Sequence, residues 1–159
     1  MDPTVNVAVV RGTSRRGAVA EALALVADDL RARVRDAPRV LIKPNLVSHC
    51  AQLPSTHADT LSAALDAVLA AGASEVTVAE GASDATAGFD RFGYRREAHG
   101  RPVRFLDLNR DERSELVLVG PGRAAGLVGG LSRVAAVHAA GRSHPAVGLS
   151  RETRRAAAG

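Results

Sequence analysis

Short apolar runs alternate with amphipathic helical stretches over the first 119 residues, and this alternation restricts the fold more than any other feature. Strands separated by helices are typical of a parallel sheet with right-handed crossovers. The sequence therefore predicts an α/β domain over residues 1–119, with a mostly parallel sheet of four to five strands and helices on its faces. The predicted strands are 5–10, 39–42, 76–79 and 103–108, with 115–119 as the fifth; the predicted helices are 19–34, 58–71 and 86–92.

The composition changes after residue 119. Residues 120–159 hold 8 of the 15 glycines and a single acidic residue, Glu152. A helical pattern is confined to 127–137, where Gly129 and Gly130 each cost about 1 kcal/mol relative to alanine. We expect a poorly ordered tail over 120–159, partly helical or disordered. Two origins stay open for it, a flexible extension or a stretch of a GC-rich gene read out of frame.

The positive charge of the chain lies in the same tail. The first 119 residues carry 15 basic and 16 acidic side chains, a net charge of −1, whereas residues 120–159 carry six arginines and one acid, a net charge of +5. Aromatic residues make up only 3% of the chain, so stacking platforms for single-stranded nucleic acid are scarce. Nucleic-acid binding is therefore an unlikely function.

Cysteine content and hydropathy bear on the compartment. Cys50 is the single cysteine, which excludes an intrachain disulfide and an iron–sulfur cluster held by four cysteines of this chain. The first residues do not read as a signal peptide, and no apolar run reaches the roughly 18 residues of a membrane span. We expect a cytoplasmic protein without a membrane partner.

Lys43 is the only lysine beside 20 arginines, and it ends the apolar run of the second predicted strand. Pro44 stops the ladder there, and Asn45 follows with a group that both donates and accepts hydrogen bonds. An ammonium at this place could bind a phosphate or carboxylate, or act as a base if it is desolvated. The alternative is a solvated charge at a strand end followed by a turn-forming asparagine.

Other polar residues and glycines follow the remaining predicted strands. Glu80 and Gly81 end the third strand, where the carboxylate could pair with Lys43, bind a metal or orient a substrate hydroxyl. Gly12 follows the first strand and Asp107 the fourth. Because the carboxyl ends of parallel strands share one edge, these residues could line one crevice that binds a small anionic molecule. The alternative for each of them is an ordinary turn.

The loop that begins at Gly12 has the outer glycine spacing of a phosphate loop. It lacks the Lys-Ser/Thr pair that completes such a loop, since Ala18 and Val19 follow Gly17 instead. Two interpretations stay open, an anion site at a helix N-terminus or a capped strand-to-helix turn.

Thr56, His57 and Asp59 precede or begin the second predicted helix. Thr56 and Asp59 fit a capping box, which predicts a structural role for Thr56 beside its candidacy as a ligand contact. His57 would then lie in the first helical turn, where the dipole favours the neutral imidazole and makes it an acid–base candidate. His49 and Cys50 bring two more metal donors close in sequence, but the spacing matches no standard zinc motif, so we expect no metal site.

Several runs of this sequence together have a familiar pattern. They are Val40–Val47, Ser55–His57, Ala70–Ala73, Val76–Gly81, Thr86, Phe89, Phe92–Tyr94 and Leu106–Asn109. Over about residues 5–119 the chain resembles the family catalogued as domain of unknown function 362. The resemblance implies an α/β domain and a redox association through a ferredoxin-type segment.

The chain departs from that family in two ways. The ferredoxin cysteines are absent, so cluster binding is not carried over and the cofactor is unknown. The Lys-rich, His-containing segment that members carry in their second half is also missing, since His138 and His144 are not accompanied by lysine. The resemblance thus implies the N-terminal portion of a family member.

Two hypotheses follow. The first is a ligand-binding or enzymatic domain whose catalytic candidates are Lys43, His57 and Glu80, and whose ligand-binding candidates are Gly12, Lys43, Asn45, Thr56, Gly81 and Asp107. The second is a truncated or frameshifted, non-catalytic remnant that acts as an interaction module, through self-association or with a ferredoxin-like partner.

Overall fold

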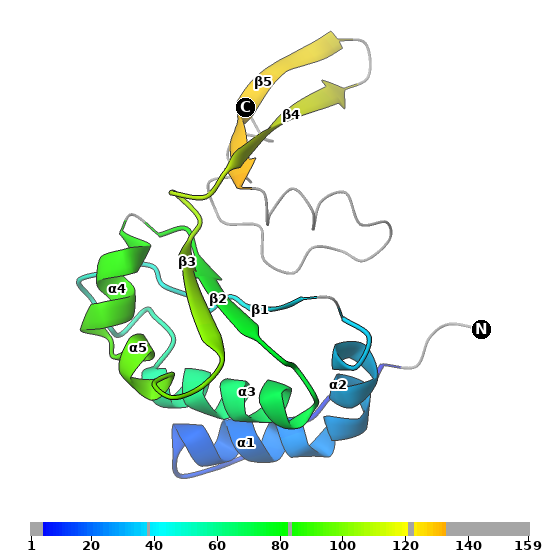
Figure 1. The fold of residues 1–159 in the computed structure, drawn as a ribbon, viewed down its shortest axis with the longest axis vertical. Coiled ribbons are helices and arrows are strands. Elements are labelled where there is room, and N and C mark those ends of the chain that lie inside the picture. The colour runs from blue at the N-terminus through cyan, green and yellow to red at the C-terminus, as the bar shows by residue number, and fades with distance from the viewer. Residues whose placement is uncertain (1–4, 38, 83, 121–122, 133–159) are drawn as a thin grey trace. The chain divides into compact units, whose positions relative to one another are not determined.

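The computed structural model describes residues 5–37, 39–82, 84–120 and 123–132 (Figure 1). The chain divides into two compact units, Met1–Leu106 and Asp107–Gly159. Along the first unit the elements are α1 (Arg15–Leu25), α2 (Ala27–Val34), β1 (Val40–Ile42), α3 (Ala58–Ala70), β2 (Val76–Glu80), α4 (Ala85–Arg91), α5 (Tyr94–Glu97) and β3 (Val103–Asp107).

The sheet of the first unit has the order β1-β2-β3 and is parallel. Val40 lies opposite Val76 and Ile42 opposite Val78, so β-branched side chains face each other across the ladder. The α/β class and the parallel sheet are confirmed. Among the described residues this sheet has three strands, so the predicted four to five are not reached.

Residues 5–10 do not form the predicted first strand. Val5, Val7 and Val9 are 76%, 80% and 86% exposed, and the side chain of Asn6 donates to Asp29 of α2 at 2.8 Å. The alternation of valines fits a pleated strand, but strand propensity acts through packing and pairing with neighbours. This segment is not paired in the sheet, so the alternation of valines alone did not predict its structure correctly.

The predicted helix over 19–34 is two helices, α1 and α2. Val26 separates them with φ −115° and ψ 23°, outside helical values. Ser14 is the N-cap of α1, and its hydroxyl accepts from the backbone N–H of Gly17 at 3.1 Å. Of the two interpretations of the loop that begins at Gly12, the structure therefore shows the capped turn into a helix.

Helix α3 supplies one side of the core. Leu61, Leu65 and Val68 are buried on the face that packs against the sheet, and α1 lies along α3 (Figure 1). The helix stops where predicted, because Gly72 follows with φ +107°, a left-handed conformation that glycine adopts without a Cβ penalty.

The two short helices also contribute to the core, beside the buried valines of β2. Phe89 of α4 and Tyr94 of α5 are fully buried, with ring centroids 6.2 Å apart. Leu46, from the loop after β1, packs among them. A Cβ on Gly88 would come within 2.5 Å of Leu46 Cδ1, so only glycine leaves room for that leucine. The core thus anchors the loop that carries the candidate site.

The second unit contains an antiparallel hairpin of β4 (Arg113–Gly120) and β5 (Arg123–Ser132). The strand expected over 115–119 exists within β4, but it pairs antiparallel with β5. The helix expected over 127–137 is wrong for 127–132, which belong to β5 and pair with the apolar segment of β4; residues 133–137 lie outside the described residues. The tail expected over 120–159 is described only at 120 and 123–132.

The helices in the described ranges are all too short or too polar to traverse a lipid bilayer.

Candidate functional site

Lys43 and Glu80 meet at the carboxyl ends of β1 and β2. The Nζ of Lys43 donates to Oε2 of Glu80 at 2.7 Å, as an ion pair. The Glu80 side chain is 6% exposed, whereas that of Lys43 is 30% exposed. The pairing that the sequence suggested is confirmed, and it joins a buried carboxylate to an ammonium that reaches the surface.

Glu80 also receives two backbone donors. The N–H of Leu46 donates to Oε2 at 3.2 Å, and that of Gly81 donates to Oε1 at 2.7 Å. With Lys43 these make three donors on one buried carboxylate. Gly81 thus contributes its N–H to Glu80. Glu80 in turn holds both Lys43 and the start of the loop that follows β1.

Asn45 and Thr56 close the base of that loop. The N–H of Thr56 donates to the carbonyl of Asn45 at 2.7 Å, and the N–H of Asn45 donates to the hydroxyl of Thr56 at 2.9 Å. The side-chain amide of Asn45 donates to the carbonyl of Pro54 at 2.8 Å. We call residues 43–56 the clamp loop, because these bonds tie its two ends together.

Tyr94 joins the clamp loop to α5. Its hydroxyl donates to the carbonyl of Thr56, which also accepts from the side chain of Gln52 at 3.1 Å. Burial, and secondly the negative charge of Glu80, raise the pKa of Tyr94 to about 12. Tyr94 therefore keeps its proton and its hydrogen bond at neutral pH.

The sequence did not single out Tyr94 or Leu46 as parts of the site. Both residues are buried and hold the clamp loop in place through hydrogen bonds and packing, whereas the sequence pointed to polar residues at strand ends. The only available signal was that Tyr94 is the single tyrosine of the chain.

His57, and not Thr56, is the N-cap of α3, and no side chain caps that helix. The capping box is wrong because the Thr56 hydroxyl accepts from Asn45, and Asp59 accepts from its neighbour Thr60 at 2.8 Å. His57 is half-buried and follows Thr56 directly. Its first-turn neighbour Asp59 adds a negative charge that disfavours an anion at this helix end.

Gly12 lies before α1 and is exposed. A Cβ on it would meet the Cβ of Ala18 at 2.8 Å, so its glycine character serves the close turn into the helix. The segment that precedes it is not a strand, so Gly12 does not lie at a strand end as expected.

Asp107 ends β3 and belongs to the second unit. Its Oδ1 accepts from the backbone and side-chain N–H groups of Asn109, at 3.0 and 3.1 Å, and its Oδ2 lies 3.8 Å from Nε of Arg110. These bonds are those of a turn, the alternative that the sequence left open. Its place in the predicted crevice stays a prediction.

Metal ligands do not converge in the described part of the chain, where no three His, Cys, Asp or Glu side chains form a group that could hold an ion. Cys50 is exposed in the clamp loop, where its N–H donates to the hydroxyl of Ser48 at 3.1 Å.

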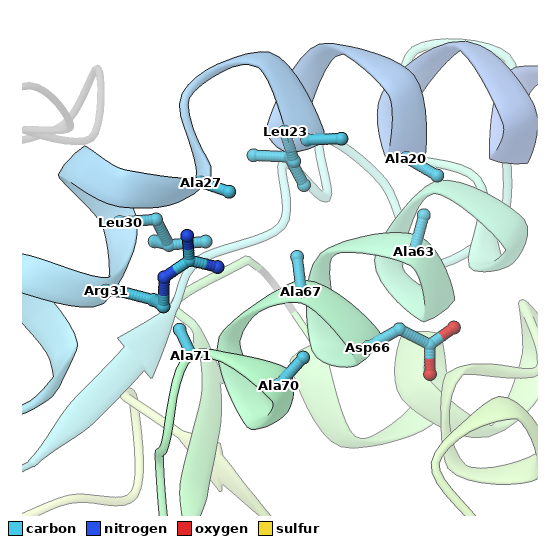
Figure 2. A pocket seen from close by; sticks show the side chains of 11 residues that line it. Ala20, Leu23, Ala27, Leu30, Arg31, Ala63, Asp66, Ala67, Ala70 and Ala71 are labelled. Atoms are coloured by element: carbon cyan, nitrogen blue, oxygen red, sulfur yellow. The ribbon is translucent and has the colours of Figure 1, made fainter.

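A pocket of about 300 Å³ lies away from these residues, between the α1–α2 pair and α3 (Figure 2). Its lining is mostly alanine with Leu23 and Leu30, and Arg31 and Asp66 supply the charges. Asp66 is already paired with Arg16 at 2.9 Å and Arg101 at 3.1 Å. The pocket is thus a gap between small side chains of packed helices, without a polar group free to orient a ligand.

Residues 40–128 match the family described as Domain of unknown function (DUF362). The chain belongs to this family. The match begins at β1, includes Lys43, the clamp loop and Glu80, and extends through β4 into β5. Neither the curated proteins nor the solved structures contain a significant match to this chain.

The extent of the match bears on the change of composition at residue 120. Residues 120–128 lie within the matched range, so the family pattern continues across that change. Residues 129–159 lie outside the match, and the origin of the stretch after residue 119 stays a prediction.

Proposed function

We propose that the first unit binds a small anion at Lys43. The observation that carries the proposal is the pairing of this partly exposed ammonium with the buried Glu80. An ammonium has three N–H donors, and the bond to Glu80 uses one of them. The others are available to a carboxylate or phosphate oxygen at the carboxyl end of β1, where α/β proteins commonly bind ligands.

In this proposal Glu80 positions the ammonium rather than acting as a base. Its carboxylate already accepts from three donors, two of which belong to Lys43 and to the start of the clamp loop at Leu46. His57 is the remaining acid–base candidate, because it is half-buried and follows Thr56, whose hydroxyl is bonded to Asn45 just after β1. Asn45 and Thr56 hold the loop in place and contact a ligand only at its margin.

Calorimetric titration of the full chain with acetate and with inorganic phosphate tests the proposal. Lys43→Met should abolish anion binding, and Lys43→Arg should retain part of it because the charge is kept. Arg33→Gln, an exposed position of α2, is the matched control for loss of one positive charge. Equal affinity of the wild type and Lys43→Met would refute the proposal.

A second candidate function, an interaction module, is favoured by the edge of the sheet. β1 is an outer strand in the order β1-β2-β3, and Leu41 at its centre is 41% exposed. An open strand edge can pair with another chain. Light scattering should then show a concentration-dependent dimer that Leu41→Lys dissociates. A monomer at the highest attainable concentration would exclude self-association.

The redox role implied by the family resemblance also stays a proposal. The 159 residues of this chain contain one cysteine, Cys50, and cannot hold a four-cysteine cluster by themselves, so the proposal places the cluster on a ferredoxin-like partner. Copurification of such a partner with the full chain, detected by its visible absorption, would support this role.

A further inference from the structure

We infer that the anion bound at Lys43 is amphiphilic: a monocarboxylate that carries an aliphatic or aromatic body. The inference rests on the proposed anion site and names its ligand class. It depends on two features of the clamp loop that the anion proposal does not use, namely two exposed aliphatic side chains and the neutral total charge of the Lys43–Glu80 pair.

The aliphatic side chains are those of Val47 and Leu53, which are 62% and 94% exposed. Val47 follows Leu46, whose N–H is bonded to the same Glu80 oxygen as Lys43. Leu53 precedes Pro54, whose carbonyl is bonded to Asn45. Each exposed aliphatic residue is therefore next in sequence to a residue tied into the Lys43 site, and in this inference the two side chains supply the apolar surface for a ligand held by the ammonium.

The loop that displays them is internally bonded. Besides the clamp between Asn45 and Thr56, the N–H of Ser55 donates to the carbonyl of Gln52 at 2.9 Å, and the Ser55 hydroxyl donates to the carbonyl of Ala51 at 3.3 Å. A loop already held in one conformation loses little entropy when a ligand binds. The exposure of Leu53 thus costs apolar hydration in the free protein, and an apolar ligand would relieve that cost.

The charge of the pair favours a monoanion. Lys43 and Glu80 sum to zero, and the carboxylate lies 2.7 Å behind the ammonium. Attraction to the pair grows in proportion to the charge of the ligand, whereas the cost of desolvating the ligand grows with the square of that charge. A monoanion therefore needs less compensation from a pair of zero net charge, and a carboxylate can use the two remaining ammonium protons.

The test compares octanoate, acetate and inorganic phosphate by calorimetric titration of the full chain. Octanoate should bind at least about tenfold tighter than acetate, which corresponds to burial of about two methylene groups. Leu53→Ser and Val47→Ser should each weaken octanoate about threefold or more and leave acetate unchanged. Val9→Ser removes an equally exposed aliphatic side chain, 86% exposed, outside the loop and should change neither affinity.

The outcomes separate this inference from the anion proposal. Acetate binding that requires Lys43, with octanoate no tighter or insensitive to Leu53→Ser, would overturn the inference alone. Phosphate binding tighter than that of acetate would overturn its charge argument. Failure of all three anions to bind would overturn the anion proposal itself, and octanoate binding that Val9→Ser weakens equally would reveal nonspecific adsorption and reject the loop as the site.

Discussion

The clamp loop and the segment 5–12 are both outside helices and strands, and both carry exposed aliphatic residues. They differ in what holds them. The clamp loop is tied through Glu80, Tyr94 and Leu46 to buried elements, whereas the side chain of Asn6 bonds the exposed Asp29. Exposed polar and apolar residues occur in both segments, so they do not distinguish a candidate site. The distinguishing feature is the set of bonds and contacts that tie a loop to buried residues.

The largest expected effect is the loss of Glu80, which holds the start of the clamp loop. Glu80→Ala leaves Lys43 unpaired and the N–H groups of Leu46 and Gly81 without their acceptor, so the free energy of unfolding should fall by about 3–5 kcal/mol. Urea unfolding measures this change. Lys43→Met should cost less, because the carboxylate keeps two donors and the lysine is partly exposed. Equal costs would contradict the assignment of Glu80 as the central support.

A smaller effect is expected where the loop packs on the core. Gly88→Ala places a Cβ within 2.5 Å of Leu46 Cδ1, so the leucine must move and the loop with it. The cost should be about 1–3 kcal/mol of unfolding free energy. The matched control is Gly100→Ala, where φ is +76° but nothing lies within 4 Å, so backbone strain acts without crowding. Anion binding should weaken in the first variant only.

Tyr94 connects the loop to α5 through one hydroxyl. Tyr94→Phe removes that donor from the carbonyl of Thr56 and should cost about 1 kcal/mol near neutral pH, which thermal unfolding can measure.

The pH dependence sharpens this prediction. The pKa of Tyr94 rises from 10.0 to about 12 on folding, so the folded state keeps a proton that the unfolded state releases. The associated stability is complete below pH 10 and is lost as pH rises to about 12. Because Tyr94 is the only tyrosine and the chain has no tryptophan, absorbance of the tyrosinate reports this group alone. A midpoint near pH 10 in the folded protein would contradict its burial.

The smallest effect is expected in the segment 5–12. Val7 is 80% exposed, so Val7→Ser should change the free energy of unfolding by no more than about 0.5 kcal/mol. Val78→Ser in β2 is the matched control, because Val78 is fully buried and its replacement should be severely destabilising. A large loss in Val7→Ser would mean that this segment is supported as firmly as the clamp loop.

The sequence by itself determined the elements whose signals are local. Helical periodicity placed α3, the left-handed glycine ended it at Gly72, and apolar runs placed β1, β2 and β3 within one or two residues. The pairing of Lys43 with Glu80 was also foreseeable, because the carboxyl ends of neighbouring parallel strands share an edge.

Tertiary structure decided the features that depend on distant partners. Residues 5–10 have strand propensity but no pairing in the sheet, and residues 127–132 have a helical pattern but pair as β5. Thr56 fits a capping box, yet its hydroxyl accepts from Asn45, eleven residues away. In each case a local preference worth about 1 kcal/mol or less yields to hydrogen bonds and burial that no sequence window contains.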